Sequence, residues 1–170
     1  MCELPGIRLY LEGRRNVAPG AMYQFVIERE GRRELQDGYW SILIEPKPSG
    51  AGFRPHPKFS TFNARSDRLN RAPMWKRCIR SGASSFLHQH FHEWGILPGS
   101  ERQAFSIYQS DSAIAFAAMY EIWQFETQFV PAFTIVTLPP HPKFSHIRDK
   151  SLPLILEPED FNLRLDPTYH

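Results

Sequence analysis

The sequence has few cysteines and no long apolar run. Only Cys2 and Cys78 occur among 170 residues, which excludes a framework of several disulfides, and we expect free thiols and a cytoplasmic protein, nucleoid-associated if bacterial. No stretch approaches the ~18 consecutive apolar residues of a membrane span. The first 15 residues contain no apolar core of a signal peptide. We therefore expect no membrane partner.

The chain also has little net charge, +2 overall, which argues against broad electrostatic binding of nucleic acid. Its positive charge is local instead, at Arg14-Arg15, at Arg32-Arg33 and along residues 65–80. Fifteen prolines argue against long uninterrupted helices. Aromatic residues are plentiful at 14%, and the 42% of hydrophobic residues is typical of one domain with a substantial core, here residues 1–170.

The patterning favours strands over helices. β-formers and alternation predict strands at 23–28, 35–44, 86–94, 132–138 and 152–156, and a hairpin of 105–108 with 113–120. The alanines of 113–120 also allow a helix there. A helix is expected from Asp67 after Ser66 as its cap, with Pro73 interrupting it or opening a second one. These elements predict an α+β fold that is mainly antiparallel β, with curved sheets forming a closed or half-closed barrel.

Residues 45–60 contain four prolines and two glycines and predict a long loop. The hexapeptide PHPKFS occurs in it at 55–60 and again at 140–145. Two interpretations stay open: two proline-rich loops that match by chance, or two rigid loops on the rim of one groove, each with a Lys and an aromatic ring.

Cys2 follows the initiator methionine, and this position offers a specific chemistry. Removal of Met1 leaves an α-amine with a reference pKa of about 8 next to a thiol of about 8.5. An aldehyde can form a Schiff base with that amine and then a five-membered thiazolidine with the thiol. The alternative is an incidental terminal thiol.

The densest polar cluster is HQHFHE at residues 88–93. On one strand, His88, His90 and His92 would share a face, and three imidazoles suit zinc, although neighbours on a single strand converge poorly on a tetrahedral ion. Glu93 would lie on the opposite face, where an apolar neighbour such as Trp94 would raise its pKa toward the range of a general acid. A metal-dependent hydrolase and a strand with surface histidines both remain open.

Three further polar residues follow predicted loops or strands. Asn63 can orient an amine or carbonyl and Arg65 can fork onto a phosphate, but an Asx turn explains the same residues. His146, after the strand at 132–138, stands at a common position for acid/base work, or is a surface histidine.

Five segments in order resemble the SOS-response-associated peptidase family, which shields abasic sites in single-stranded DNA. The segments, after a Met-Cys start, are RNVAPG at 15–20, FNARSD at 62–67, FHEW at 91–94, FTIVT at 133–137 and the stretch from His146 to Leu156. Glu3 and Leu4 stand where the family usually has Gly and Arg.

The resemblance implies a function and a set of roles. Cys2 would crosslink covalently to an abasic site, Asn63 would position its amine, and Glu93 and His146 would transfer protons. Arg65, Asn16 and Arg15 would bind DNA. The implied partner is single-stranded DNA with abasic sites, with no cofactor and no resident metal, while protein partners stay open. The peptidase label implies removal of residues ahead of Cys2, so we expect an enzyme. The alternative is a module that keeps the fold and DNA binding without the crosslinking chemistry.

Overall fold

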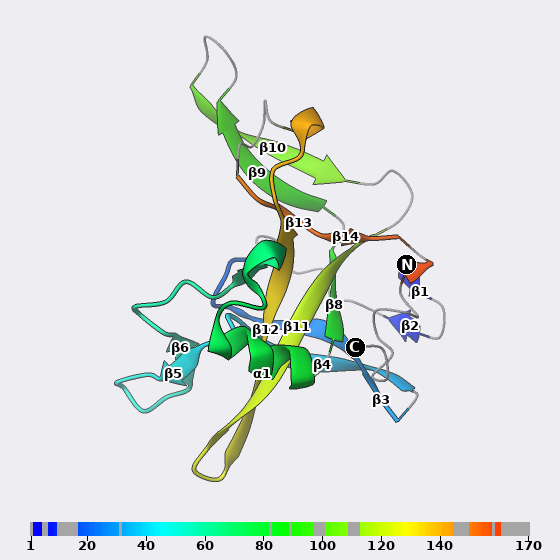
Figure 1. Ribbon diagram of the computed structural model, residues 1–170. Helices are drawn as coiled ribbons and strands as arrows, with labels where there is room; N and C mark the ends of the chain where they lie inside the picture. The colour runs from blue at the N-terminus through cyan, green and yellow to red at the C-terminus, as the bar shows by residue number, and fades with distance from the viewer. Residues whose placement is uncertain are drawn as a thin grey trace.

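A computed structural model describes residues 2–4, 7–9, 17–30, 32–81, 83–88, 90–96, 101–108, 113–144, 150–157 and 159–160. Within these residues five strands form a closed ring in the order β12–β4–β3–β8–β11 and back to β12 (Figure 1). The ring strands are β3 (Met22–Arg29), β4 (Arg32–Trp40), β8 (Ala83–His88), β11 (Ile114–Phe125) and β12 (Gln128–Leu138). Every pairing in the ring is antiparallel except β12 with β4, which is parallel. The predicted mainly antiparallel barrel is confirmed.

Aromatic rings fill the interior of this barrel, which explains their abundance in the sequence. Phe25 of β3 and Phe133 of β12 are both fully buried, with ring centroids 4.9 Å apart. Phe86 of β8 lies 5.3 Å from Phe133, and Trp40 of β4 lies 5.6 Å from Phe86. β3 and β8 are not neighbours of β12 in the ring, so these contacts cross the barrel. Side chains therefore fill the whole interior, as expected of a barrel this small.

Gly38 permits β4 to close the ring. A Cβ at this position would lie 2.7 Å from the ring of Phe25 and 2.9 Å from the carbonyl oxygen of Pro131 on β12. Real Cβ atoms do not approach a backbone oxygen that closely, so any larger residue would push β4 away from β12. Only a residue without a side chain fits here.

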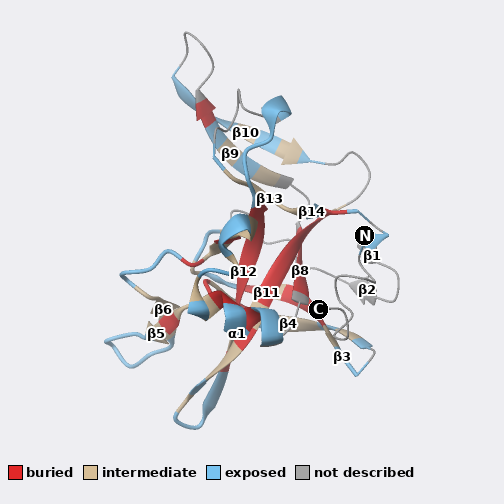
Figure 2. Ribbon diagram, viewed as in Figure 1, coloured by how far each residue is buried: buried red, intermediate tan, exposed pale blue. Residues whose placement is uncertain are grey.

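A second core lies on the outside of the barrel, under helix α1 (Pro73–Ser81). Trp75 and Cys78 are the buried residues of the helix and pack against Ala117 and Met119 of β11. The alanines of β11 suggested a possible helix in the sequence, but they lie in a strand whose small side chains let α1 approach. Figure 2 shows buried residues concentrated on β8, β11 and β12, and exposed residues along the outer side of α1.

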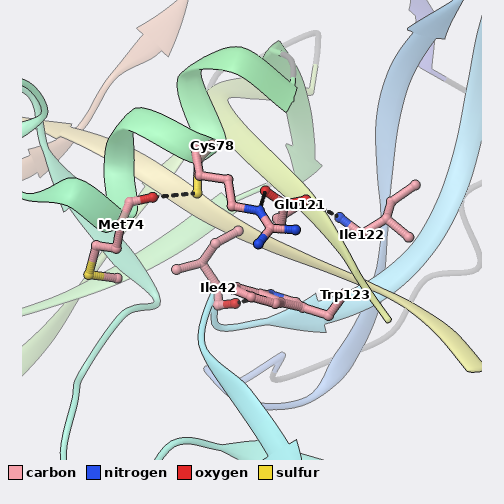
Figure 3. A network of polar contacts seen from close by, with 7 residues as sticks. Ile42, Met74, Cys78, Glu121, Ile122 and Trp123 are labelled. Atoms are coloured by element: carbon pink, nitrogen blue, oxygen red, sulfur yellow. Dashed lines mark hydrogen bonds and ion pairs between the residues drawn. The ribbon is translucent and has the colours of Figure 1, made fainter. Parts of the chain in front are cut away.

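A polar network attaches α1 to the barrel (Figure 3). Glu121 of β11 is buried and accepts hydrogen bonds from Arg77 Nε at 2.8 Å and from the backbone N–H of Ile122 at 3.1 Å. The Arg77 guanidinium also lies 4.8 Å from the ring centre of Trp123, whose indole N–H donates to the carbonyl of Ile42 at 2.7 Å. The helix is thus held by an ion pair as well as by its apolar face.

Shorter elements surround the barrel. Strand β7 (Asn63–Arg65) pairs with β12 in parallel, and β13 (Leu152–Pro153) and β14 (Ile155–Leu156) pair with β12 and β11. The other elements are β1 (Cys2–Leu4), β2 (Ile7–Leu9), β5 (Ile44–Pro46), β6 (Phe53–Pro55), β9 (His90–Ile96), β10 (Arg102–Tyr108), η1 (Ser66–Arg68) and η2 (Pro142–Phe144). Among the described residues, no helix is long and apolar enough to cross a bilayer.

Several local predictions are wrong. The segment 105–108 does not form a hairpin with 113–120, because β10 pairs with β9 while β11 pairs with β8, β12 and β14. The segment 45–60 is not only loop, since it contains the antiparallel pair β5–β6. The helix expected from Asp67 is only the single turn η1. Of the two alternatives for Pro73, the opening of a second helix is confirmed, since α1 begins there and a proline suits the first turn.

Candidate functional site at one end of the barrel

Asn63 stands at the start of β7, on a backbone that is tightly held. The carbonyl of Phe62 accepts hydrogen bonds from the Trp40 indole at 2.9 Å and from the Ile135 N–H at 3.1 Å. One residue earlier, the buried hydroxyl of Thr61 contacts the Ser41 hydroxyl at 3.0 Å and accepts from a backbone N–H at 3.0 Å. These bonds fix the position from which the Asn63 side chain projects.

The pairing of β7 with β12 determines which way its side chains point. Ala64 is paired with Val136, and both belong to the outer core under α1. Because side chains alternate along a strand, Asn63 and Arg65 face the other side, together with the interior residue Ile135. Both are half-buried. The amide and the guanidinium therefore open toward the end of the aromatic interior.

Glu93 lies on β9, whose register with β10 is unbroken from His90 to Ile96. Phe91 packs against the barrel interior, with its ring centroid 5.3 Å from that of Phe116. Glu93 shares this face and is half-buried, whereas His92 and Trp94 are exposed on the other. Trp94 points away from Glu93, because adjacent residues of a strand lie on opposite faces. Trp94 is 53% exposed and lies 5.3 Å from the Arg102 guanidinium.

The faces that carry Asn63 and Glu93 meet the same end of the barrel. Ile135, which pairs with Asn63, also pairs with Ala118 of β11. Phe116, which contacts Phe91, stands two residues from Ala118 on the same face of β11, toward the end where β12 finishes. The polar side chains of β7 and β9 are thus presented around one mouth of the aromatic interior.

Arg65 is held by a neighbouring carboxylate that the sequence interpretation did not single out. Its Nε and a terminal nitrogen donate to the two oxygens of Asp67 at 3.0 and 2.8 Å. This hydrogen bond, reinforced by the attraction of opposite charges, raises the pKa of Arg65 and lowers that of the Asp67 carboxyl. The fork expected to bind phosphate is therefore engaged by Asp67. The spacing gave no reliable signal, because residues two apart share a face only on a strand and the chain passes from β7 to η1 after Arg65.

Thr137 is a second residue that the sequence interpretation missed. It is paired with Arg65 across the β7–β12 ladder and is 1% exposed. Its hydroxyl is one of four buried side-chain groups among the described residues that lack a hydrogen-bond partner. Buried hydroxyls are usually paired, so Thr137 is an exception on the interior side of the β7–β12 ladder. A threonine within an apolar strand gave no distinguishing sequence signal.

The remaining site predictions fall on parts of the chain with less description. Cys2 lies on β1, opposite Leu9 of β2, but its side chain is outside the described part of the structure. Arg15, Asn16 and His146 lie outside the described residues altogether. The roles of these four residues stay predictions.

The three histidines do not lie on one strand. β8 ends at His88 in the barrel, and β9 begins at His90 in a separate two-stranded sheet. Among the described side chains, no three His, Cys, Asp or Glu residues gather as metal ligands, although those of His88 and His90 are not included. The prediction of a single strand with three imidazoles on one face is wrong, because His88 belongs to β8 whereas His90 and His92 belong to β9.

The two PHPKFS copies share one local turn. His56 Nδ1 accepts the backbone N–H of Lys58 at 3.2 Å, and His141 Nδ1 accepts that of Lys143 at 3.2 Å. The first copy begins at the last residue of β6, and the second follows β12 and contains η2. The two copies therefore repeat one local conformation, and the interpretation as two rims of one groove stays a prediction.

The fold and the site together define a small closed β-barrel that carries an amide, a guanidinium and a carboxylate around one mouth. Comparison with known families identifies this class. The chain belongs to the SOS response associated peptidase (SRAP) family, whose model matches residues 8–170. Membership is consistent with a role in the SOS response and DNA damage.

Solved structures show the same fold. A protein from Bacteroides thetaiotaomicron is 19% identical with a TM-score of 0.71, over 88% of this chain and 65% of its own. A protein from Bordetella bronchiseptica is 15% identical with a TM-score of 0.72, over 88% of this chain and 75% of its own. The chain thus spans about two thirds of the length of the Bacteroides protein. No curated protein matches the sequence.

Proposed function

We propose that this protein processes abasic sites in single-stranded DNA and crosslinks to them through Cys2 after loss of Met1. The observation that carries the proposal is the shared placement of Asn63 and Glu93. Asn63 pairs with Ile135, Phe91 on the face of Glu93 contacts Phe116, and both apolar residues belong to the barrel interior. An amide and a carboxylate at one mouth suit a reaction that needs amine positioning and proton transfer.

The proposed reaction has three steps at Cys2: addition of the amine, loss of water and ring closure by the thiol. The ring-opened sugar of an abasic site offers an aldehyde, and the Cys2 amine adds to its carbon to give a carbinolamine. Glu93 or His146 donates a proton to the departing hydroxyl, and water leaves to form the Schiff base. The Cys2 thiol then adds to the C=N carbon and its proton passes to the nitrogen, which closes the thiazolidine. Asn63 orients the amine, and Arg65, Asn16 and Arg15 bind the flanking strand.

Removal of Met1 is a separate hydrolytic step. While Met1 remains, the nitrogen of Cys2 is an amide and is not nucleophilic, so no thiazolidine forms. The peptidase name of the family fits self-removal of Met1 by the same carboxylate and imidazole, and a general aminopeptidase would give the same product. The proposed enzyme is therefore a hydrolase toward its own terminus and a lyase-like crosslinking protein toward DNA.

A denaturing gel tests the crosslink. Protein whose terminus has been verified by mass spectrometry is incubated with an oligonucleotide that carries one abasic site. We expect a heat-stable band of reduced mobility with wild type and with the control Cys78→Ala, which removes the buried thiol. Cys2→Ser keeps the amine but lacks the thiol, so its adduct should survive only after borohydride reduction. A wild type without a slow band, or a Cys2→Ser band that needs no reduction, contradicts the covalent mechanism.

A second function is favoured by Glu3 and Leu4, which stand beside Cys2 where the family usually has Gly and Arg. In that case the protein retains the fold and binds DNA without crosslinking. Salt-sensitive binding of the same oligonucleotide by protein with a free Cys2 terminus, with no slow band, would identify this function.

A further inference from the structure

The positive charge of the chain is concentrated in one short segment beside the proposed site. Residues 65–81 contain six basic residues and one acidic residue, a net charge of +5, whereas the whole chain carries +2. The rest of the chain therefore sums to −3. The only carboxylate in this segment, Asp67, is already bonded to Arg65. The segment forms η1 and α1, which follow directly after β7.

Four cations of the segment are exposed and make no ion pair with a described residue. Arg68, Arg71, Lys76 and Arg80 lie at the surface, and no carboxylate among the described residues pairs with any of them. Arg77 differs, because it bonds to Glu121. We define the four free cations as the basic face.

The packing of α1 determines the direction in which its cations point. Trp75 and Cys78 are buried against the barrel, so Lys76 and Arg80, four residues apart, lie on the outer side of the helix. Figure 1 shows α1 across the outside of β11 and β12, and Figure 2 shows exposed residues along its outer side. Like charges at this spacing destabilise a helix, and no acidic residue lies in its first turn to offset them. The mutual repulsion of these cations destabilises the helix, and a bound anion would offset it.

We propose that the basic face binds the phosphate backbone of a single-stranded nucleic acid, as a track that leads away from Arg65 over η1 and α1. This rests on the proposed function, which supplies a single strand at the barrel mouth. A strand leaving the mouth beside Arg65 meets Arg68 and Arg71 next, and then Lys76 and Arg80. The contacts are to phosphates, so the face increases affinity without reading sequence.

Salt dependence tests this track. The ligand is a labelled single-stranded oligonucleotide without an abasic site, and its affinity is measured over a series of salt concentrations. Each phosphate contact contributes about 0.7 to the slope of log affinity against log salt for single strands. Lys76→Gln/Arg80→Gln should reduce the slope by about 1.4 and the affinity at low salt by about tenfold. Arg68→Gln/Arg71→Gln should have the same effect.

A matched control removes the same charge elsewhere. Arg29 and Arg32 are exposed and face each other at the tip of the β3–β4 hairpin. Arg29→Gln/Arg32→Gln should change the affinity by less than about twofold, because separated surface charges are screened. Equal effects of all three double variants, or no effect of either basic-face variant, would overturn the track. Thermal unfolding should show that the basic-face variants keep the fold, since they remove only exposed charge and mutual repulsion.

Two further measurements distinguish nucleic-acid binding by the basic face from lipid binding and from the crosslinking reaction. Phosphatidylserine vesicles present anionic headgroups on a membrane. If binding to these vesicles depends on Lys76 and Arg80 but oligonucleotide binding does not, the basic face binds lipid and the track is overturned. The crosslinking gel is independent. If wild type crosslinks but the basic-face variants bind the oligonucleotide as tightly as wild type, the track is rejected and the proposed function is kept. If the salt slopes change as expected but no crosslink forms, the track is kept and the proposed crosslinking function is rejected.

Discussion

Two arginine–carboxylate pairs of this protein have similar geometry and different surroundings. Arg77 meets Glu121 at 2.8 Å between α1 and the barrel, and Arg65 meets Asp67 at 2.8 Å at the barrel mouth. The Glu121 side chain is 7% exposed, whereas that of Asp67 is 45% exposed. A distance alone therefore does not distinguish a structural ion pair from an exchangeable one.

The difference follows from what else holds each partner. Glu121 is also bonded to a backbone N–H, and Arg77 lies over Trp123, so the pair joins elements far apart in sequence. Arg65 and Asp67 are two residues apart and both face solvent, where water can replace either partner. The first pair attaches a helix, and the second keeps a cation in place until another anion competes for it.

The largest effect should come from removing Arg77. Arg77→Met leaves the Glu121 carboxylate buried without its cation, and because Arg77 itself is 60% exposed we expect a loss of about 2 kcal/mol, below the full cost of breaking a buried pair. Arg65→Met should leave the free energy of unfolding close to that of wild type, because this pair is exposed to solvent. Urea unfolding measures both. Equal losses in the two variants would remove the distinction between the pairs.

The free energy of unfolding should also fall at alkaline pH, because the buried Cys78 thiol lies on the same helix as Arg77. Burial, and secondly the charge of Glu121, raise the pKa of the Cys78 thiol to about 12 from a reference value of 9.0. A pKa raised on folding means that the stabilisation is complete below the unfolded value and is lost as pH rises from about 9 toward 12.

Unfolding free energies measured between neutral pH and the upper end of that window should fall more steeply for wild type than for Cys78→Ala. Other groups that titrate there are common to both proteins and cancel in the difference. Parallel profiles would show that the thiol does not sense burial and Glu121. The same burial keeps Cys78 from competing with Cys2 for an aldehyde.

The smallest effect should appear at Arg65. Asp67→Asn weakens the competitor for the guanidinium fork, so affinity for a single-stranded oligonucleotide without an abasic site should rise about twofold or more. Fluorescence anisotropy measures it. Asp37→Asn, an exposed carboxylate on β4, makes the same charge change away from Arg65 and should have less effect. In an Arg65→Met background the advantage of Asp67→Asn over Asp37→Asn should disappear, and its persistence would mean that the two side chains do not compete.

Local patterns in the sequence predicted much of this molecule. Alternation of apolar and polar residues found the strands that became β3, β4 and β12, the hydrophobic content anticipated a substantial core, and the order of the motifs indicated the family. Each of these signals depends on neighbouring residues or on their order along the chain. Asn63 and Glu93 could be selected as site residues for the same reason.

Partners in space could not be predicted in this way. Nothing within 105–120 shows that β10 pairs with β9 while β11 joins the barrel, or that β8 and β9 separate between His88 and His90. The engagement of Arg65 by Asp67 likewise depends on rotamers at the end of β7. Pairing is decided by burial over the whole chain, since each strand takes the partner that closes the aromatic interior.

The sequence by itself determined the β-rich character of the domain and a candidate set of polar residues. Only the tertiary structure decided that the ring closes through β12 and β4, with Gly38 permitting the approach, and that the faces carrying Asn63 and Glu93 share one mouth. The physical reason is that alternation is a property of neighbours, whereas closure requires residues about 90 positions apart to fit within van der Waals contact.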